Sequence, residues 1–87
     1  MTYSGMCRNI QFQAANGATV SIAVGSSVYC EPRTEAGPYT RIEAGFPGGI
    51  IPESWMEYAE DLGDPHYTVY GYMPCGLLAD WFIANKE

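Results

Sequence analysis

Three cysteines and one histidine are the residues of this chain best suited to nucleophilic or metal chemistry. They are Cys7, Cys30, Cys75 and His66, and four such ligands would suffice for a tetrahedral zinc site. No two of them lie at the close sequence spacing that zinc sites usually have, and the predicted elements scatter them. We therefore expect buried, apolar cysteines and no metal or other cofactor.

Cys75 follows Pro74 at the predicted first turn of the last helix, where the helix dipole and free N–H groups lower the pKa of a thiol. With His66 as a base, Cys75 is a candidate nucleophile. Nothing in the sequence orients the pair, and the glycines around Phe46 match neither a P-loop nor a dinucleotide-binding motif. A structural role for Cys75 is the favoured interpretation, and a thiol- or metal-dependent enzyme remains an alternative.

An acidic run in the second half of the chain is the feature from which we predict a function. If residues 53–62 are helical, its acids form a broad exposed face on which like charges stand four residues apart, which costs a few tenths of a kcal/mol per pair. The last acids also sit at the helix C-terminus, where the dipole disfavours negative charge. Charges placed unfavourably in this way, with no compensating contact, often mark a functional surface. The predicted partner-binding residues are Glu53, Glu57, Tyr58, Glu60, Asp61 and Asp64.

The charges of the whole chain are divided unequally along the sequence. The net charge is −6; residues 1–41 sum to +1, and residues 42–87 sum to −7 because Lys86 is their only cation. The first part carries Arg8, Arg33 and Arg41 with Glu31 and Glu35. Direct nucleic-acid binding needs cations that neutralise phosphates, so the acidic part argues against it. A protein partner with a basic surface is the natural complement, while acidity that only maintains solubility is the alternative.

Length and composition indicate one globular domain over residues 1–87. The chain is 47% hydrophobic and 16% charged, the reverse of a disordered composition. It has no apolar run of the roughly 18 residues that a membrane span needs, and its first residues lack a signal-peptide pattern. An odd number of cysteines is unlike a disulfide-stapled secreted domain. We therefore expect a cytoplasmic protein with no membrane association.

Alternating apolar residues predict strands at 9–14 and 18–24, joined by a tight turn at Asn16-Gly17. Further strands are predicted at 39–46 and 67–73, and residues 28–30 are left open as a short additional strand. Ser54 and Glu57 fit a capping box for a helix over 52–62, with Pro52 as a competing start and Gly63 as its stop. A final helix begins at Pro74 and packs Leu78, Trp81 and Phe82 on the sheet, with Leu77 and Asn85 on the same side.

This order of elements predicts an α+β fold. The expected architecture is a small, mostly antiparallel sheet in the order ββ(β)βαβα, with two short helices on one face. The seven tyrosines exceed what a small core needs, and those near the acids and on the strand at 67–73 suit a protein interface. Simple sheet packing is the alternative for the tyrosines of that strand.

In overall character the chain resembles the small inhibitors that phages and mobile elements encode, of which the anti-CRISPR proteins are the best-known group. The resemblance rests on small size, an isolated α+β fold, an acidic half and the absence of a catalytic motif, and it includes no shared motif. It implies carboxylates placed where DNA phosphates would lie on a basic channel of a host effector. The phosphate mimics would then be Glu53, Glu57, Glu60, Asp61 and Asp64, with Tyr58 as a flanking contact.

Three hypotheses follow from the sequence. The first is a non-enzymatic inhibitor that binds a basic, nucleic-acid-handling surface of a host effector such as a CRISPR–Cas complex. The second is a small structural or assembly protein, viral or from a mobile element, that acts through tyrosine-rich sheet contacts. The third is the thiol or metal enzyme based on Cys75 and His66.

Overall fold

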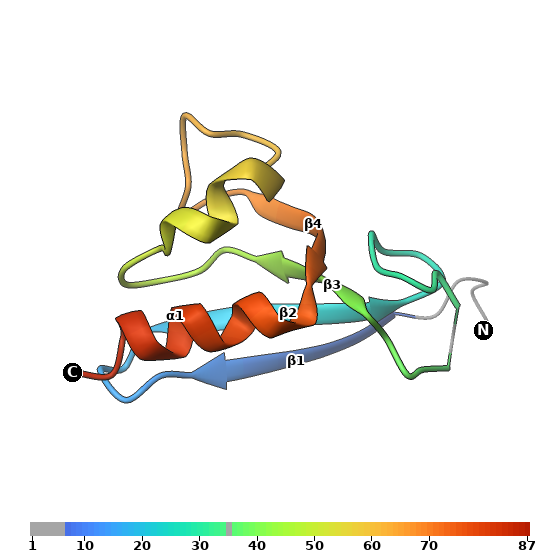
Figure 1. Ribbon diagram of the computed structural model, residues 1–87, viewed down its shortest axis with the longest axis horizontal. Coiled ribbons are helices and arrows are strands. Elements are labelled where there is room, and N and C mark those ends of the chain that lie inside the picture. Colours follow the sequence, from blue (N-terminus) through green and yellow to red (C-terminus); the bar gives the residue numbers. More distant parts are fainter. Residues whose placement is uncertain (1–6, 35) are drawn as a thin grey trace.

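Four antiparallel strands form a single sheet in the computed structural model, which describes residues 7–34 and 36–87 (Figure 1). In chain order the strands are β1 (Cys7–Gln13), β2 (Thr19–Gly25), β3 (Arg41–Gly45) and β4 (Val69–Pro74), and this is also their order in the sheet. Three helical segments complete the fold: the 3-10 helices η1 (Glu53–Tyr58) and η2 (Cys75–Leu77), and the α-helix α1 (Leu78–Ala84). The predicted α+β fold is confirmed.

The hairpin of β1 and β2 follows from the alternation of apolar residues and from the Asn16-Gly17 pair. Its register is unbroken from Cys7 opposite Gly25 to Gln13 opposite Thr19. The turn uses three residues, because Ala14 N donates to Ala18 O at 2.8 Å and Gly17 N donates back to Ala14 O at 2.9 Å. Gly17 has φ +93°, the left-handed conformation that closes such a turn.

The main core lies between one face of the sheet and the helical segments. Its largest fully buried side chains are Trp55 of η1, Tyr70 and Met73 of β4, and Trp81 of α1. The indole Nε1 of Trp55 donates to Leu77 O at 2.8 Å, and that of Trp81 donates to Gly48 O at 3.0 Å. Each tryptophan therefore buries its ring without leaving its N–H unpaired, and η1 and α1 both cover the same face, as predicted.

The opposite face of the sheet is covered at one end by the loop between β2 and β3, which contains the residues 28–30 left open above as a short strand. Ala23, Val28 and Cys30 are buried there, with Tyr39 packed against them. Residues 28–30 form no strand. Instead Tyr29 O accepts from Tyr72 N at 2.8 Å, and a single bridge pairs Glu31 with Arg41. The small Ala23 side chain leaves room for this loop to approach the sheet.

The predicted helix over 52–62 is wrong in type and length. It is a 3-10 helix that ends at Tyr58, because Ala59 forms a bridge with Tyr70 and Glu60 N donates to Val69 O at 3.0 Å. These backbone groups pair with β4 and cannot continue a helix. The capping box is also wrong, since η1 has no side-chain cap; Pro52 holds the N-cap position, and Gly63 is not its stop.

The last helix begins later than predicted, with the short η2 preceding α1, and residues 77, 78, 81, 82 and 85 are buried or half-buried as expected. Ile10 departs from the pattern: it lies on the core face of β1 yet is 60% exposed. The helix α1 reaches β1 at Phe12, whose ring meets Phe82 edge-on at 6.0 Å between centroids, and leaves Ile10 uncovered.

Candidate functional site

Five carboxylates lie on η1 and on the loop that connects it to β4. All five are exposed, and we call them the acidic surface: Glu53, Glu57, Glu60, Asp61 and Asp64. This segment runs along and beyond the β4 side of the sheet, at the opposite side from β1 (Figure 1). The structure therefore keeps the predicted acids within one segment, although not on one helix.

The 3-10 geometry of η1 changes how the first two acids are related. With three residues per turn, side chains four apart point about 120° away from each other, whereas an α-helix would bring them to about 40°. Glu53 and Glu57 are therefore splayed and do not form the predicted like-charge pair. The same period aligns Trp55 with Tyr58, and both face the core. Tyr58 is half-buried and packs against the core, so it anchors η1 and offers only part of its ring to a partner.

The loop after η1 fixes the other three acids through its backbone. Asp61 N donates to Thr68 Oγ1 at 3.1 Å, and the Asp61 carboxylate accepts from Gly63 N at 2.9 Å. Asp64 N donates to Asp61 O at 3.2 Å, and Tyr67 N donates to Asp64 O at 3.0 Å. None of Glu60, Asp61 and Asp64 lies at a helix C-terminus, so the predicted dipole penalty does not apply.

None of the five acids forms an ion pair within residues 7–34 and 36–87. The ion pair found there joins Arg41 Nε to Glu31 at 3.5 Å, on the other side of the molecule. Asp80 of α1 lies close by and adds a sixth carboxylate, which accepts from the Ser54 hydroxyl at 2.7 Å. The charges of this segment are thus exposed and are not paired within the described fold.

Exposed apolar side chains flank the acidic surface, a position that was not predicted. Leu62 and Tyr67 lie within the same loop and are 62% and 74% exposed. Phe46, 58% exposed, joins them because its N–H donates to Thr68 O at 3.1 Å, while His66 Nε2 contacts Gly49 O at 2.9 Å. Pairing across the β3–β4 ladder, which the sequence does not display, brings residues 46–49 beside residues 66–68.

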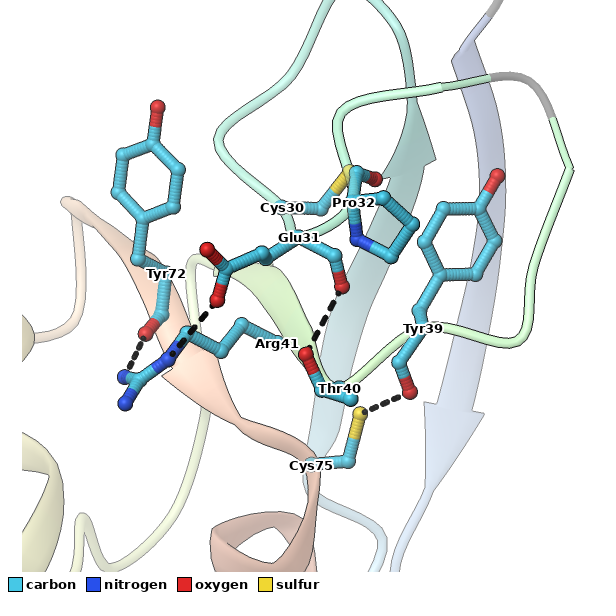
Figure 2. Close-up of polar contacts among 8 residues, drawn as sticks. All are labelled: Cys30, Glu31, Pro32, Tyr39, Thr40, Arg41, Tyr72 and Cys75. Carbon is cyan, nitrogen blue, oxygen red and sulfur yellow. Dashed lines mark hydrogen bonds and ion pairs between the residues drawn. The ribbon is translucent and has the colours of Figure 1, made fainter.

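Arg41 lies on the face of β3 and β4 opposite the main core, where Figure 2 shows its guanidinium between two acceptors. Its Nη1 donates to Tyr72 O at 2.8 Å, and its Nε pairs with Glu31. Tyr72 lies in a bulge of β4 and has φ +53°; its ring stacks on Tyr29 at 5.5 Å between centroids. Arg33 lies over the Tyr29 ring at 5.4 Å. These contacts hold the loop between β2 and β3 on the sheet.

The tyrosines of β4 do not form one exposed row. Tyr70 is fully buried, and its hydroxyl donates to Pro65 O at 2.6 Å. Burial raises the pKa of Tyr70. Tyr67 and Tyr72 are exposed at opposite ends of the strand, and Tyr72 is partly covered by its stack with Tyr29.

The predicted Cys75–His66 pair is not assembled. Cys75 follows β4 and donates from Sγ to Tyr39 O at 3.3 Å, whereas His66 precedes β4 and contacts Gly49. The two residues precede and follow the six-residue strand β4, which would span roughly 20 Å if fully extended, and each contacts a different part of the chain. Burial raises the pKa of the Cys75 thiol and outweighs the opposing backbone hydrogen bond, so the predicted lowering of this pKa by a helix N-terminus is wrong. The helical turn that begins at Cys75 has only three residues and supplies little dipole.

Metal ligands do not gather in the described part of the chain: no three His, Cys, Asp or Glu side chains there could share an ion. Cys30 is buried, with Sγ between Gly25 O at 3.1 Å and Pro32 O at 3.3 Å. The structure does not describe residues 1–6, Glu35 or the side chain of Cys7. The predictions about zinc, charge and a signal peptide rest partly on these residues. No pocket suited to a small ligand opens among the residues described, nor is any helix there long and apolar enough to cross a membrane.

Comparison with known proteins found no matching family model, curated protein or solved structure. The functional argument therefore rests on the acidic surface and its surroundings.

Proposed function

We propose that this protein is a non-enzymatic inhibitor whose acidic surface binds a basic, nucleic-acid-handling surface of a host effector, such as a subunit of a CRISPR–Cas complex. The single observation that carries the proposal is a segment of five exposed carboxylates, none of which forms an ion pair in the described part of the fold. A basic channel that normally holds phosphates offers the complementary potential. The protein binds there in place of the nucleic acid and touches no nucleic acid itself.

The geometry supports binding in two ways. The carboxylates come from a 3-10 helix and a hydrogen-bonded loop, so their backbone is ordered before binding and little conformational entropy is lost on association. Leu62 and Tyr67 provide exposed apolar and aromatic area among the charges. Aromatic contacts at the centre and charged groups at the rim are the usual composition of a protein interface. The proposed contact residues are thus the five acids with Tyr67, and Tyr58 supports them from behind.

The test begins with affinity capture of partners from a bacterial lysate and continues with the captured effector in purified form. The variant Glu57→Gln/Glu60→Gln/Asp61→Asn removes three charges and keeps every side-chain shape and the Asp61 acceptor. Three exposed charge pairs of about 0.5 kcal/mol each predict affinity weakened by at least about tenfold. Binding is also expected to weaken with rising salt, because exposed charges are screened, and to compete with single-stranded nucleic acid.

The matched control is Glu31→Gln/Glu43→Gln/Glu87→Gln, which changes the net charge equally at positions outside the acidic surface. It should bind as wild type does. Equal weakening by both triple variants would mean that net charge alone acts, and a complex indifferent to salt and to nucleic acid would contradict the proposal. A captured partner that binds the first variant as tightly as it binds wild type would favour the structural-assembly alternative.

A further inference from the structure

The outer edge of β1 is the part of the sheet that the fold leaves open. At the other edge, residues 59–60 pair with β4 and close it. No described segment pairs with the outer side of β1, and its seven residues run without a bulge or a proline. Proteins usually protect such an edge with a bulge, a proline, inward charges or a covering segment, because free N–H and C=O groups pair readily with another strand.

The hydrogen-bond pattern of the hairpin identifies which groups are free. Ala14 N donates across the hairpin to Ala18 O, so the even-numbered residues of β1 direct their backbone groups toward β2. The bond from Gly48 N to Thr19 O agrees, since it shows that Thr19, opposite Gln13, faces away from β1. The N–H and C=O groups of Asn9, Gln11 and Gln13 therefore point outward from the sheet.

We propose that β1 pairs with β1 of a second copy of this chain, in antiparallel fashion about a twofold axis at Ile10. In this register Asn9 lies opposite the partner's Gln11, and their outward-facing backbone groups exchange hydrogen bonds. Ile10 lies against the partner's Ile10 in a non-hydrogen-bonded pair, where side chains approach most closely. The pairing covers an isoleucine that the monomer leaves 60% exposed on the core face, and twofold symmetry closes the assembly at two copies.

A second copy suits this edge electrostatically as well. The strand carries one charge, Arg8, and the register places it opposite the partner's Phe12, so no like charges face each other. Each chain has net charge −6, but the acidic surface lies beyond β4, three strand spacings or about 14 Å from β1 across the sheet. The dimer holds the two acidic surfaces at its far ends, where their repulsion is screened by salt.

The test is sedimentation velocity of the full chain from low micromolar to near-millimolar concentration. Wild type is expected to shift from the monomer mass of 9.5 kDa to twice that value, and the shift should strengthen with salt, the opposite of the effect on the acidic surface. Ile10→Lys puts two ammonium groups at the axis and should weaken the dimer at least tenfold. Leu62→Lys, the same change at a comparably exposed apolar residue beyond β4, should leave the dimer intact.

A second variant tests the edge through its backbone. Gln11→Pro removes an outward N–H and no bond to β2, so it should remain folded by circular dichroism and be monomeric, whereas Gln11→Ser should dimerise. Within β1, hydrogen exchange in concentrated wild type should show new protection at the outward-facing amides of residues 7, 9, 11 and 13 and at no even-numbered amide. A wild-type chain that stays monomeric throughout, or a dimer that survives both Ile10→Lys and Gln11→Pro, overturns the proposal without affecting the proposed function.

Discussion

Asn85 joins three parts of the chain at the end of α1, and its side chain is fully buried. Its Oδ1 accepts from Ile50 N at 2.7 Å and from Asn16 Nδ2 at 3.0 Å, and its Nδ2 donates to Ile50 O and to Trp81 O, each at 2.8 Å. The amide thus fills its four hydrogen-bonding sites. It connects the β1–β2 turn to the loop after β3.

Asn85→Ala should be the most damaging single truncation of a polar side chain in this protein. It removes four hydrogen bonds, three of them part-buried and one buried, and a typical hydrogen bond contributes about 0.5–1.5 kcal/mol. We expect a loss of about 3 kcal/mol or more in the free energy of unfolding, measured by urea denaturation. Asn16→Ala, at an exposed residue of the same network, should cost less than half as much. Equal losses would show that Asn85 does not dominate the network.

At the scale of single residues, the sequence predicts which side chains are buried better than it predicts what they bind. The helical spacing places Asn85 on the inner side of the last helix with Trp81, and the structure confirms this. Its partners at positions 16 and 50 lie far away in sequence, so no local pattern could reveal them. Cys75 illustrates the same limit, because the burial that raises its pKa comes from the packing of the whole chain.

At the scale of elements, strands were predictable because alternation acts over neighbouring residues, and both β1 and β2 were found within two residues of their predicted bounds. The helix over 52–62 was predicted wrongly, because the spacing of Trp55, Met56 and Ala59 fits an α-helix, whereas η1 is a 3-10 helix that ends before Ala59. The helix ends early because the backbones of Ala59 and Glu60 pair with β4. Competition between a helix and a sheet edge is a tertiary effect that propensity does not contain.

The bulge of β4 provides a prediction at this scale. Ile42 faces Met73 and Ala44 faces Tyr70, so two residues of β4 oppose Glu43, and one of them, Tyr72, takes φ +53°. Tyr72→Ala and Tyr72→Gly both remove the stack on Tyr29, but only glycine adopts this φ without steric cost. Tyr72→Gly should therefore be more stable than Tyr72→Ala by about 0.5–1 kcal/mol in urea denaturation. The reverse order, usual in a regular strand, would contradict the bulge.

At the scale of the whole molecule, sheet order separates the charges. Arg41 attaches the β2–β3 loop to one face through Glu31, and Arg33 contacts Tyr29 within that loop. The acids follow the β4 side and form no ion pair in the described chain. The sequence predicted the division into a slightly basic and a strongly acidic part, because that needs only a count. It could not predict that Phe46 lies beside the loop that carries the acids, since pairing of β3 with β4 brings it there.

This separation leads to a prediction about stability that distinguishes a functional acidic surface from a structural one. Carboxylates kept for binding repel one another in the free protein, so Glu57→Gln/Glu60→Gln/Asp61→Asn should raise the free energy of unfolding by about 0.5 kcal/mol, or about 2–4 °C in Tm. Added salt should raise the Tm of wild type more than that of this variant, since salt screens the same repulsion.

The control Glu31→Gln/Glu43→Gln/Glu87→Gln should gain no stability. The change at Glu31 removes its ion pair with Arg41, and the change at Glu43 leaves a weaker acceptor for Tyr29 N. Thermal unfolding of the three proteins at low and high salt measures both effects. A first variant less stable than wild type would mean that these acids hold the loop together. If the first variant is more stable than wild type but fails to bind, the three acids lower the stability of the free protein and serve to bind a basic partner.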